Sequence, residues 1–256
     1  MSATPVSSIG FVGLGNFGGF FNERLIDTFG FKVDVLGFDT SPEPTRESTA
    51  TFDQIAACDI IIPSVPIPAF EPVVKDLVSR DSYKGGVIVD VCSVKAYPFH
   101  VLRQLRRDVP WCLKHPLFGP ESFADNANSL EGLPIVTCEA HWDKTAEQKV
   151  KWLFEYLPLK DHPMTSREHD ATVSAYQFLT QFFGRGVEGV IPWDVEHAVL
   201  TRSSELFHRA MKMVRGDEAL FWTIYQYNPY CKYYADRVME NLANMEEKRR
   251  GLKVFC

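Results

Sequence analysis

The sequence lacks the features that mark several classes of protein. No apolar run approaches the ~20 residues that a membrane-spanning helix needs. The N-terminal MSATPVSS has neither the basic region nor the apolar core of a secretory signal peptide. Basic residues number 27 against 33 acidic ones, for a net charge of -6, and they are scattered along the chain. Since nucleic-acid binding requires a concentrated basic surface, we expect neither nucleic-acid binding nor membrane insertion.

Cysteine is also sparse, with six residues at positions 58, 92, 112, 138, 231 and 256. None forms a C-x-x-C pair, and the seven histidines show no metal-ligand spacing. Several cysteines lie in apolar segments, which is typical of reduced, packed thiols. These patterns predict a cytoplasmic protein with no structural metal and no disulfide framework.

Short apolar runs alternate with helix-like segments in the first part of the chain. Such runs predict strands at residues 9–12, 33–38, 60–64, 87–91, 111–114 and 134–137. Near-continuous apolar strands separated by helices are typical of a parallel sheet covered on both faces. We therefore predict an α/β domain over residues 1–163.

The pattern changes after residue 163. Thr165 and Glu168 form a T-x-x-E capping box, which predicts a helix start. Apolar residues then recur at helical spacing, and few strand signals follow. We predict a C-terminal all-α domain over residues 164–256.

The segment IGFVGLGNFG contains a G-x-G-x-x-G motif directly after the first predicted strand. Its glycines permit a tight turn, close approach of a pyrophosphate and close helix packing, so the motif predicts a Rossmann-type dinucleotide-binding domain. The second strand ends at Asp39, whose carboxylate suits the ribose hydroxyls of NAD and repels the 2′-phosphate of NADP. Arg46 nearby leaves NADP open as the less favoured cofactor. The predicted cofactor contacts are Gly13, Leu14, Gly15, Asn16, Phe17, Gly18, Asp39, Ser64, Val65 and Pro66.

Polar residues follow two further strands. VDVCSVK places Ser93 and Lys95 after the fourth predicted strand, and LKHPLFGPES places His115 at the end of the fifth. Ligands of open α/β sheets bind beyond the carboxyl ends of the strands. We therefore expect Ser93, Lys95 and His115 to lie at the same edge as the glycine motif.

The chain resembles the prephenate/arogenate dehydrogenases of tyrosine biosynthesis. The resemblance rests on DVCSVK at 90–95, HPLFGPES at 115–122, EHD at 168–170 and AYQFLTQFFGR at 175–185. It implies NAD(P)-dependent oxidative decarboxylation of arogenate or prephenate, giving tyrosine or 4-hydroxyphenylpyruvate. By the same resemblance, His115 is the base that takes the proton of the ring hydroxyl, and Ser93 orients it. The resemblance also implies a homodimer formed through the helical domain, and we favour a structural or hinge role for His169.

The predicted substrate site departs from the family pattern. Gln181 stands where the family usually has a second histidine, and Lys212 lies near the position of an arginine that clamps a substrate carboxylate. Arg185 and Arg202 are alternatives for that clamp, and Lys95 is a further candidate for anchoring a carboxylate. Two alternatives stay open: a dehydrogenase for a modified substrate such as 4-amino-4-deoxyprephenate, and a non-catalytic NAD(H)-binding regulatory relative.

Overall fold

The computed structural model describes residues 5–41, 47–191, 200–213 and 217–252. The chain divides into two compact units, Met1–His169 and Asp170–Cys256. The described part of the first unit combines a sheet with helices, and that of the second contains helices alone. This confirms the predicted fold class. The division falls six residues after the predicted boundary at residue 163.

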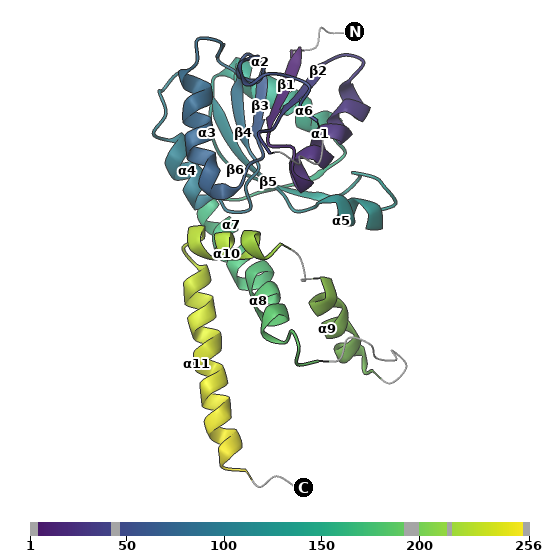
Figure 1. Cartoon of the computed structure of the whole chain (residues 1–256), viewed down its shortest axis with the longest axis vertical. Helices are drawn as coiled ribbons and strands as arrows, with labels where there is room; N and C mark the ends of the chain where they lie inside the picture. Colours follow the sequence, from purple (N-terminus) through teal and green to yellow (C-terminus); the bar gives the residue numbers. More distant parts are fainter. Residues whose placement is uncertain (1–4, 42–46, 192–199, 214–216, 253–256) are drawn as a thin grey trace. The chain divides into compact units, whose positions relative to one another are not determined.

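The sheet of the first unit has seven strands in the order β2-β1-β3-β4-β5-β6-β7 (Figure 1). They are β1 (Ser8–Val12), β2 (Asp34–Phe38), β3 (Ile60–Pro63), β4 (Val87–Asp90), β5 (Trp111–Pro116), β6 (Pro134–His141) and β7 (Lys160–Pro163). All neighbouring pairs are parallel except β5 and β6, which are antiparallel. The predicted parallel sheet is thus correct for β1–β5, whereas the reversal at β6 and the polar edge strand β7 were not predicted.

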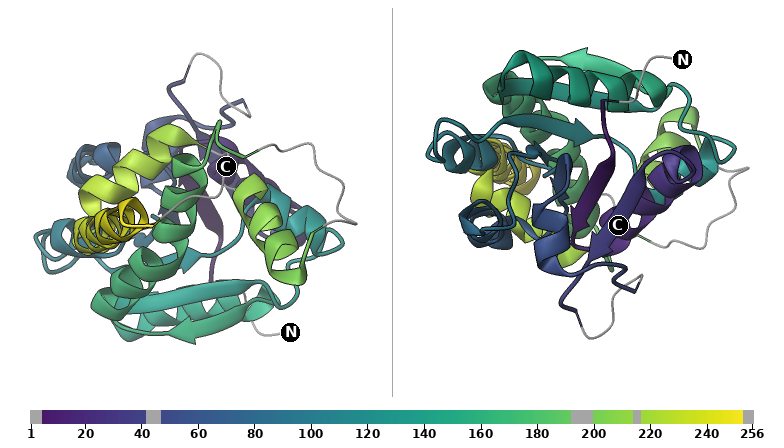
Figure 2. Two further views of the ribbon diagram at one scale, coloured as in Figure 1. Left: turned by 90° about the horizontal axis from the view of Figure 1, so that it is seen from below. Right: turned by 90° about the horizontal axis from the view of Figure 1, so that it is seen from above.

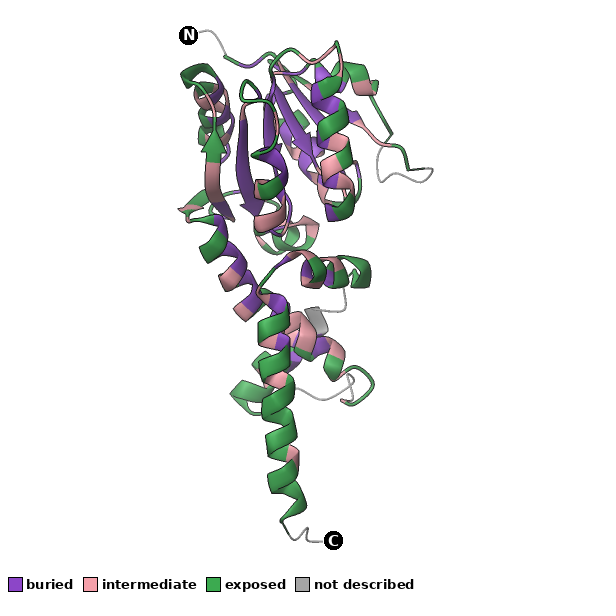
Figure 3. Ribbon diagram, turned by 90° about the vertical axis from the view of Figure 1, so that its left-hand side faces the viewer, coloured by how far each residue is buried: buried purple, intermediate pink, exposed green. Residues whose placement is uncertain are grey.

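Helices cover both faces of this sheet (Figures 1 and 2). Those of the first unit are α1 (Asn16–Phe29), α2 (Phe52–Ala56), α3 (Ile67–Ser79), α4 (Ala96–Leu102), α5 (Pro120–Asp125) and α6 (Lys144–Tyr156), followed by the first turn of α7 (Ser166–Val173). Side chains alternate along each strand, so Ile60 and Ile62 join α1 and α6 in one core cluster. The intervening Ile61 is equally buried on the opposite face. Figure 3 shows the strands of the sheet as the most continuously buried part of this unit.

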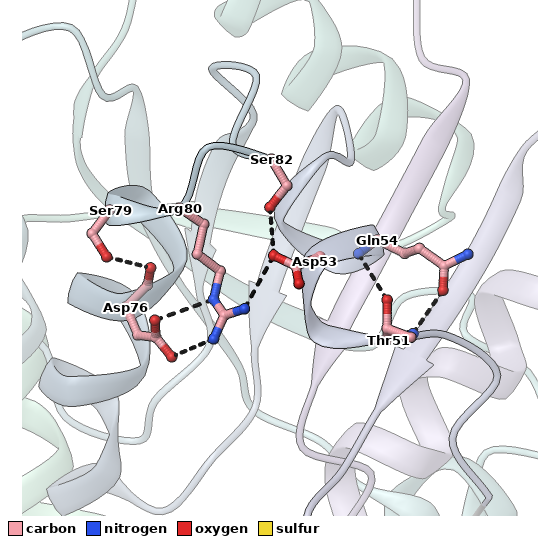
Figure 4. Close-up of polar contacts among 7 residues, drawn as sticks. All are labelled: Thr51, Asp53, Gln54, Asp76, Ser79, Arg80 and Ser82. Atoms are coloured by element: carbon pink, nitrogen blue, oxygen red, sulfur yellow. Dashed lines mark hydrogen bonds and ion pairs between the residues drawn. The ribbon is translucent and has the colours of Figure 1, made fainter.

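Polar contacts hold α2 beside α3 (Figure 4). The guanidinium of Arg80 donates hydrogen bonds to Asp76 at 3.1 Å and to Asp53 at 3.0 Å. Helix α2 begins with a capping box in which Thr51 N donates to Gln54 Oε1 at 2.7 Å and Gln54 N donates to Thr51 Oγ1 at 3.3 Å. The carboxylates of Asp53 and Asp76 are exposed, so solvent screens these ion pairs, and they mainly hold the two helices side by side.

The second unit continues α7 into a π-helical turn, η1 (Ser174–Phe178), and then α8 (Leu179–Gly186). It also contains α9 (Arg202–Met213), α10 (Glu218–Tyr227) and α11 (Cys231–Arg250). Its core includes the rings of Phe178 and Phe221, which stack with centroids 5.3 Å apart. The helical character was predicted, but the π turn was not. Among the described helices, none is long and apolar enough to cross a membrane.

We expect Leu153→Ala in α6 to destabilise the protein by about 2–5 kcal/mol, because it leaves a cavity under a fully buried side chain. Lys151→Ala on the exposed face of the same helix removes only a solvent-screened surface pair with Glu147 and should leave the stability close to that of wild type. Urea denaturation followed by tryptophan fluorescence measures both. An equal loss in the free energy of unfolding for the two variants would contradict the packing of Leu153 in the core.

Candidate active site

A glycine loop joins β1 to α1. Gly13 has φ +95°, and a Cβ there would lie 2.3 Å from the carbonyl oxygen of Ser64. A Cβ on Gly18 would lie 2.1 Å from the carbonyl oxygen of Gly13, whereas one on Gly15 would meet no atom within 4 Å. Gly13 and Gly18 are therefore required by the fold itself. Gly15 presents an open stretch of backbone that a ligand can approach.

The residues around this loop fit a dinucleotide. Helix α1 begins at exposed Asn16 after Gly15, with no side-chain cap and no acidic residue in its first turn, so its amides suit phosphate oxygens. The Asp39 carboxylate accepts hydrogen bonds from the backbone N–H of Leu14 at 2.5 Å and of Ser41 at 2.7 Å. It is thereby held beside the loop, where an adenosine ribose would bind in this fold. Arg46 lies outside the described residues.

The segment after β3 lies against the glycine loop. Ser64 N donates to the carbonyl of Val12 at 2.7 Å, and a Cβ on Gly18 would lie 2.9 Å from Ser64 Oγ. The order of strands reverses between β1 and β3, and such a switch point is where doubly wound sheets bind ligands. Ser64 and Val65 thus lie against the glycine loop, and Pro66 follows them at the start of α3; their contact with a cofactor stays a prediction.

Ser93 follows β4, and His115 lies near the end of the neighbouring strand β5. Asp90 of β4 is in register with Leu113 of β5, and both strands run in the same direction. Strand β5 extends through Pro116, two residues beyond its predicted end, because β6 pairs with His115 and Pro116. Ser93 is half-buried, and within the described structure no hydrogen bond joins it to His115. Its orienting role stays a prediction.

Lys95 is fully buried and forms an ion pair with Asp90, which is also fully buried. Its ammonium also donates to the carbonyl of Lys114 at 2.7 Å, and Asp90 accepts a hydrogen bond from Cys92 N at 2.9 Å. An ammonium that is buried and bound to protein groups is poorly placed to bind a substrate carboxylate. The geometry therefore argues against that predicted role and favours one in holding the site together.

His115 is 4% exposed and pairs with a second histidine. Its Nδ1 lies 2.7 Å from Nε2 of His169, and the two ring centroids are 5.0 Å apart. Burial lowers the pKa of His115 well below its usual range, and electrostatic interaction with the neighbouring His169 and Lys95 adds to this effect. Sequence reasoning missed this contact: the EHD motif marked His169, but it did not reveal which residue His169 meets.

The start of α7 positions His169. The predicted capping box is confirmed: Thr165 Oγ1 and N donate to Glu168 Oε2 at 2.8 and 2.9 Å, and Glu168 N donates to Thr165 Oγ1 at 3.2 Å. Ser166 N and Oγ both donate to the carboxylate of Glu139 on β6. The first turn of α7 is thus fixed to the sheet by Ser166, three residues before His169.

The loop after His115 packs on the glycine-loop helix. Phe118 is 6% exposed, and its ring lies 6.4 Å from Phe17 and 6.2 Å from Phe21 of α1, measured between centroids. Leu117 N donates to the carbonyl of Pro134 at 3.0 Å. These contacts join the two halves of the predicted site within the first unit.

Lys114 points to the other face of β5. Its ammonium donates to Thr137 Oγ1 at 2.6 Å and lies 4.3 Å from the ring centroid of Phe154. It lines a cavity of about 350 Å³ against α6, together with Asp161 and other residues. The alternation along β5 therefore separates this cavity from His115.

The other predicted substrate-binding residues belong to the second unit. Gln181 and Arg185 are half-buried and lie one turn apart on α8, so they share a helix face. The Arg185 guanidinium lies 4.8 Å from the ring centroid of Phe221. Lys212 falls in α9, and its side chain lies outside the described residues. The roles predicted for these residues in binding substrate stay predictions.

Comparison with known proteins supports the fold. The structure of prephenate dehydrogenase from Aquifex aeolicus with hydroxyphenyl propionate and NAD+ matches with a TM-score of 0.71 and 20% identity, over 94% of this chain and 90% of that one. The Synechocystis arogenate dehydrogenase matches with a TM-score of 0.65 and 18% identity, over 94% and 93% of the two chains.

Sequence comparison gives the family. Arogenate dehydrogenase 1, chloroplastic, from Arabidopsis thaliana is 25% identical over 239 residues, which are 90% of this chain and 37% of that protein. The chain thus spans little more than a third of the length of this curated relative. Residues 24–160 match the family model described as "Prephenate dehydrogenase, nucleotide-binding domain". The match covers more than half of the chain, which therefore belongs to the prephenate dehydrogenase family.

Proposed function

We propose that the protein is an NAD-dependent dehydrogenase that oxidatively decarboxylates a cyclohexadienyl substrate, either arogenate or prephenate. The observation that carries the proposal is the placement of His115 at the same sheet edge as the glycine loop, with Phe118 joining the two. A catalytically silent relative would have no need of a buried histidine held at the cofactor edge. The family membership and the dinucleotide-binding geometry support the same activity.

His115 acts as the base in this proposal. The bound nicotinamide supplies the acceptor for the hydride that leaves the ring carbon bearing the hydroxyl group. His115 Nε2 takes the hydroxyl proton. The ring carboxylate then leaves as CO₂, and the electrons of the broken C–C bond restore the aromatic ring as a phenolate, which takes a proton back to give the phenol. Aromatisation drives the reaction, so the chain contributes alignment and proton transfer. Ser93 orients the hydroxyl, and Gln181 and Arg185 are the proposed contacts to the rest of the substrate.

Asp39 favours NAD over NADP. Its carboxylate is fixed by two backbone N–H groups and faces the place of the adenosine ribose, so it would repel a 2′-phosphate. The named relative structure with NAD+ supports the same choice. NADP stays the less favoured alternative.

We further propose a cytoplasmic homodimer formed through the helical unit. Cys58, Cys92, Cys112 and Cys231 are buried free thiols, which suit a reducing compartment. Helix α11 is largely exposed (Figure 3). Its apolar stripe starts at the buried Cys231 and Ala235 and continues through the exposed side chains of Met239, Leu242 and Met245. A continuous stripe of this kind is typical of a helix that packs against a second copy.

His115→Asn should leave NAD binding intact and lower turnover by on the order of 100-fold or more, because the general base is lost. The measurements are NAD affinity by titration calorimetry and steady-state turnover of arogenate, prephenate and 4-amino-4-deoxyprephenate. His141→Asn, at the far end of β6, is the matched control and should behave as wild type. Normal turnover in His115→Asn would remove this residue from the mechanism, and exclusive turnover of the amino analogue would replace the proposed substrate.

Asp39→Asn should raise the affinity for NADP relative to NAD by roughly 10-fold or more, because it removes the repulsion of the 2′-phosphate and keeps an acceptor for Leu14 N–H. Fluorescence titration with the two cofactors gives this ratio without any assay of catalysis. Asp34→Asn at the opposite end of β2 is the control. A ratio equal to that of wild type would show that Asp39 does not set cofactor choice.

Leu242→Glu should convert the dimer to monomer, because it places a charge in the apolar stripe of α11. Sedimentation velocity at micromolar concentration measures the assembly state. Asn244→Glu adds the same charge on a different face of the helix and should leave the dimer intact. A monomeric wild-type protein would overturn the proposed assembly.

A further inference from the structure

Two histidines meet at the end of β5 with well-defined geometry. His115 and His169 are 4% and 1% exposed, and their rings are inclined at 68° with Nδ1 of the first 2.7 Å from Nε2 of the second. This distance is that of a hydrogen bond between two imidazoles. Such a bond needs one N–H donor and one nitrogen lone pair, so the pair adopts one of two proton arrangements.

The arrangement decides what His115 can do. If His169 donates, His115 carries its remaining proton on Nε2 and cannot accept another there. If His115 donates from Nδ1, its Nε2 keeps a lone pair, and the ring is ready to act as a base. The nitrogen that faces away from His169 is thus set by the bond that His169 makes.

Contacts outside the pair hold His169 in place. Glu139 on β6 binds the Ser166 N–H and hydroxyl, and the Thr165–Glu168 capping box closes the first turn of α7. The same strand β6 pairs with His115 through Val136. One strand therefore fixes both partners, which is the arrangement expected for two side chains that must keep a defined angle.

We infer that His169 is a positioning residue that accepts a hydrogen bond from Nδ1–H of His115 and thereby keeps Nε2 of His115 unprotonated and aimed at the reacting hydroxyl. This inference rests on the proposed function. When Nε2 takes the substrate proton, His115 becomes an imidazolium, and its Nδ1–H bond to the neutral His169 becomes charge-assisted. The proton stays on His115 until the ring oxygen of the product takes it back after CO₂ has left.

The charges around His115 suit this role. His169 faces it from α7, Lys95 from the segment after β4, and Asp90 of β4 balances the charge of Lys95. From β6 the opposing residue is the apolar Val136. In the described surroundings of His115, no carboxylate forms an ion pair with it, so burial and the nearby positive charge keep its pKa low.

Nuclear magnetic resonance of ¹⁵N-labelled histidine side chains tests the arrangement directly, with the His115 signals assigned from their loss in His115→Asn. We expect wild-type His115 to carry its proton on Nδ1 and to lack one on Nε2. A wild-type His115 protonated on Nε2 would overturn the inference, whatever the activity. This readout does not depend on the substrate, so it is separate from failure of the proposed function.

Three substitutions at position 169 extend the test to catalysis. His169→Phe removes the acceptor and should lower kcat by roughly 10-fold or more with little change in KM for NAD, while His169→Gln, which can accept, should recover much of it. His169→Glu places a carboxylate against the ring and should move the acidic limb of the pH–rate profile upward by about one to two pH units. His100→Gln on α4 is the control.

The kcat values and pH–rate profiles of the three variants distinguish a positioning role for His169 from a merely structural one. A structural role predicts losses that follow stability and leave the pH profile in place. If His169→Phe fails to fold, the Gln and Glu variants still decide, because only the positioning role predicts that His169→Glu moves the acidic limb of the pH–rate profile upward. An unshifted acidic limb in His169→Glu would contradict the inference.

Discussion

A buried ion pair between Asp90 and Lys95 holds the candidate site together. The carboxylate ends β4, the ammonium comes from five residues further along, and the same ammonium binds the backbone carbonyl that immediately precedes His115. Removing one member of such a pair leaves an uncompensated buried charge, at a cost of roughly 3–5 kcal/mol. The ion pair therefore holds the loop with Ser93 against the strand with His115. The same Lys95 ammonium also lowers the pKa of His115.

Aromatic packing connects this piece to the cofactor edge. Phe118 lies three residues after His115 and packs on Phe17 and Phe21, which lie in the first two turns after the glycine loop. Phe17 and Phe21 also stack on each other with centroids 5.5 Å apart. A displacement of α1 would thus also move Phe118 and the segment that connects it to His115. Interiors are close-packed, so the distance between a cofactor on α1 and this base has little freedom to vary.

Local patterns in the sequence predicted the local parts of the site. The glycine motif, Asp39 and the Thr165–Glu168 capping box depend on residues a few positions apart or on one strand–helix–strand unit, and all three lie where predicted. The contact of His115 with His169 spans 54 residues, and the burial of Lys95 depends on strand pairing, so neither has a local signal. Strand β7, KDHP, has no apolar pattern because it is an exposed edge. The antiparallel β6 looks like any other apolar run, since direction leaves no mark on composition.

The electrostatics of the site suit a weak base. As hydride leaves the substrate carbon, the attached hydroxyl becomes a protonated carbonyl, whose proton is strongly acidic. A base with a low pKa can accept that proton late in the reaction and is not already protonated beforehand at neutral pH. A carboxylate partner, as in serine-protease triads, would raise the pKa of His115 and slow the later release of the proton from the ring. A neutral histidine partner orients the ring without that rise. The ammonium of Lys95 lowers the pKa of His115 further. The buried surroundings of His115 and the nearby Lys95 therefore give the histidine the low basicity that the proposed reaction requires.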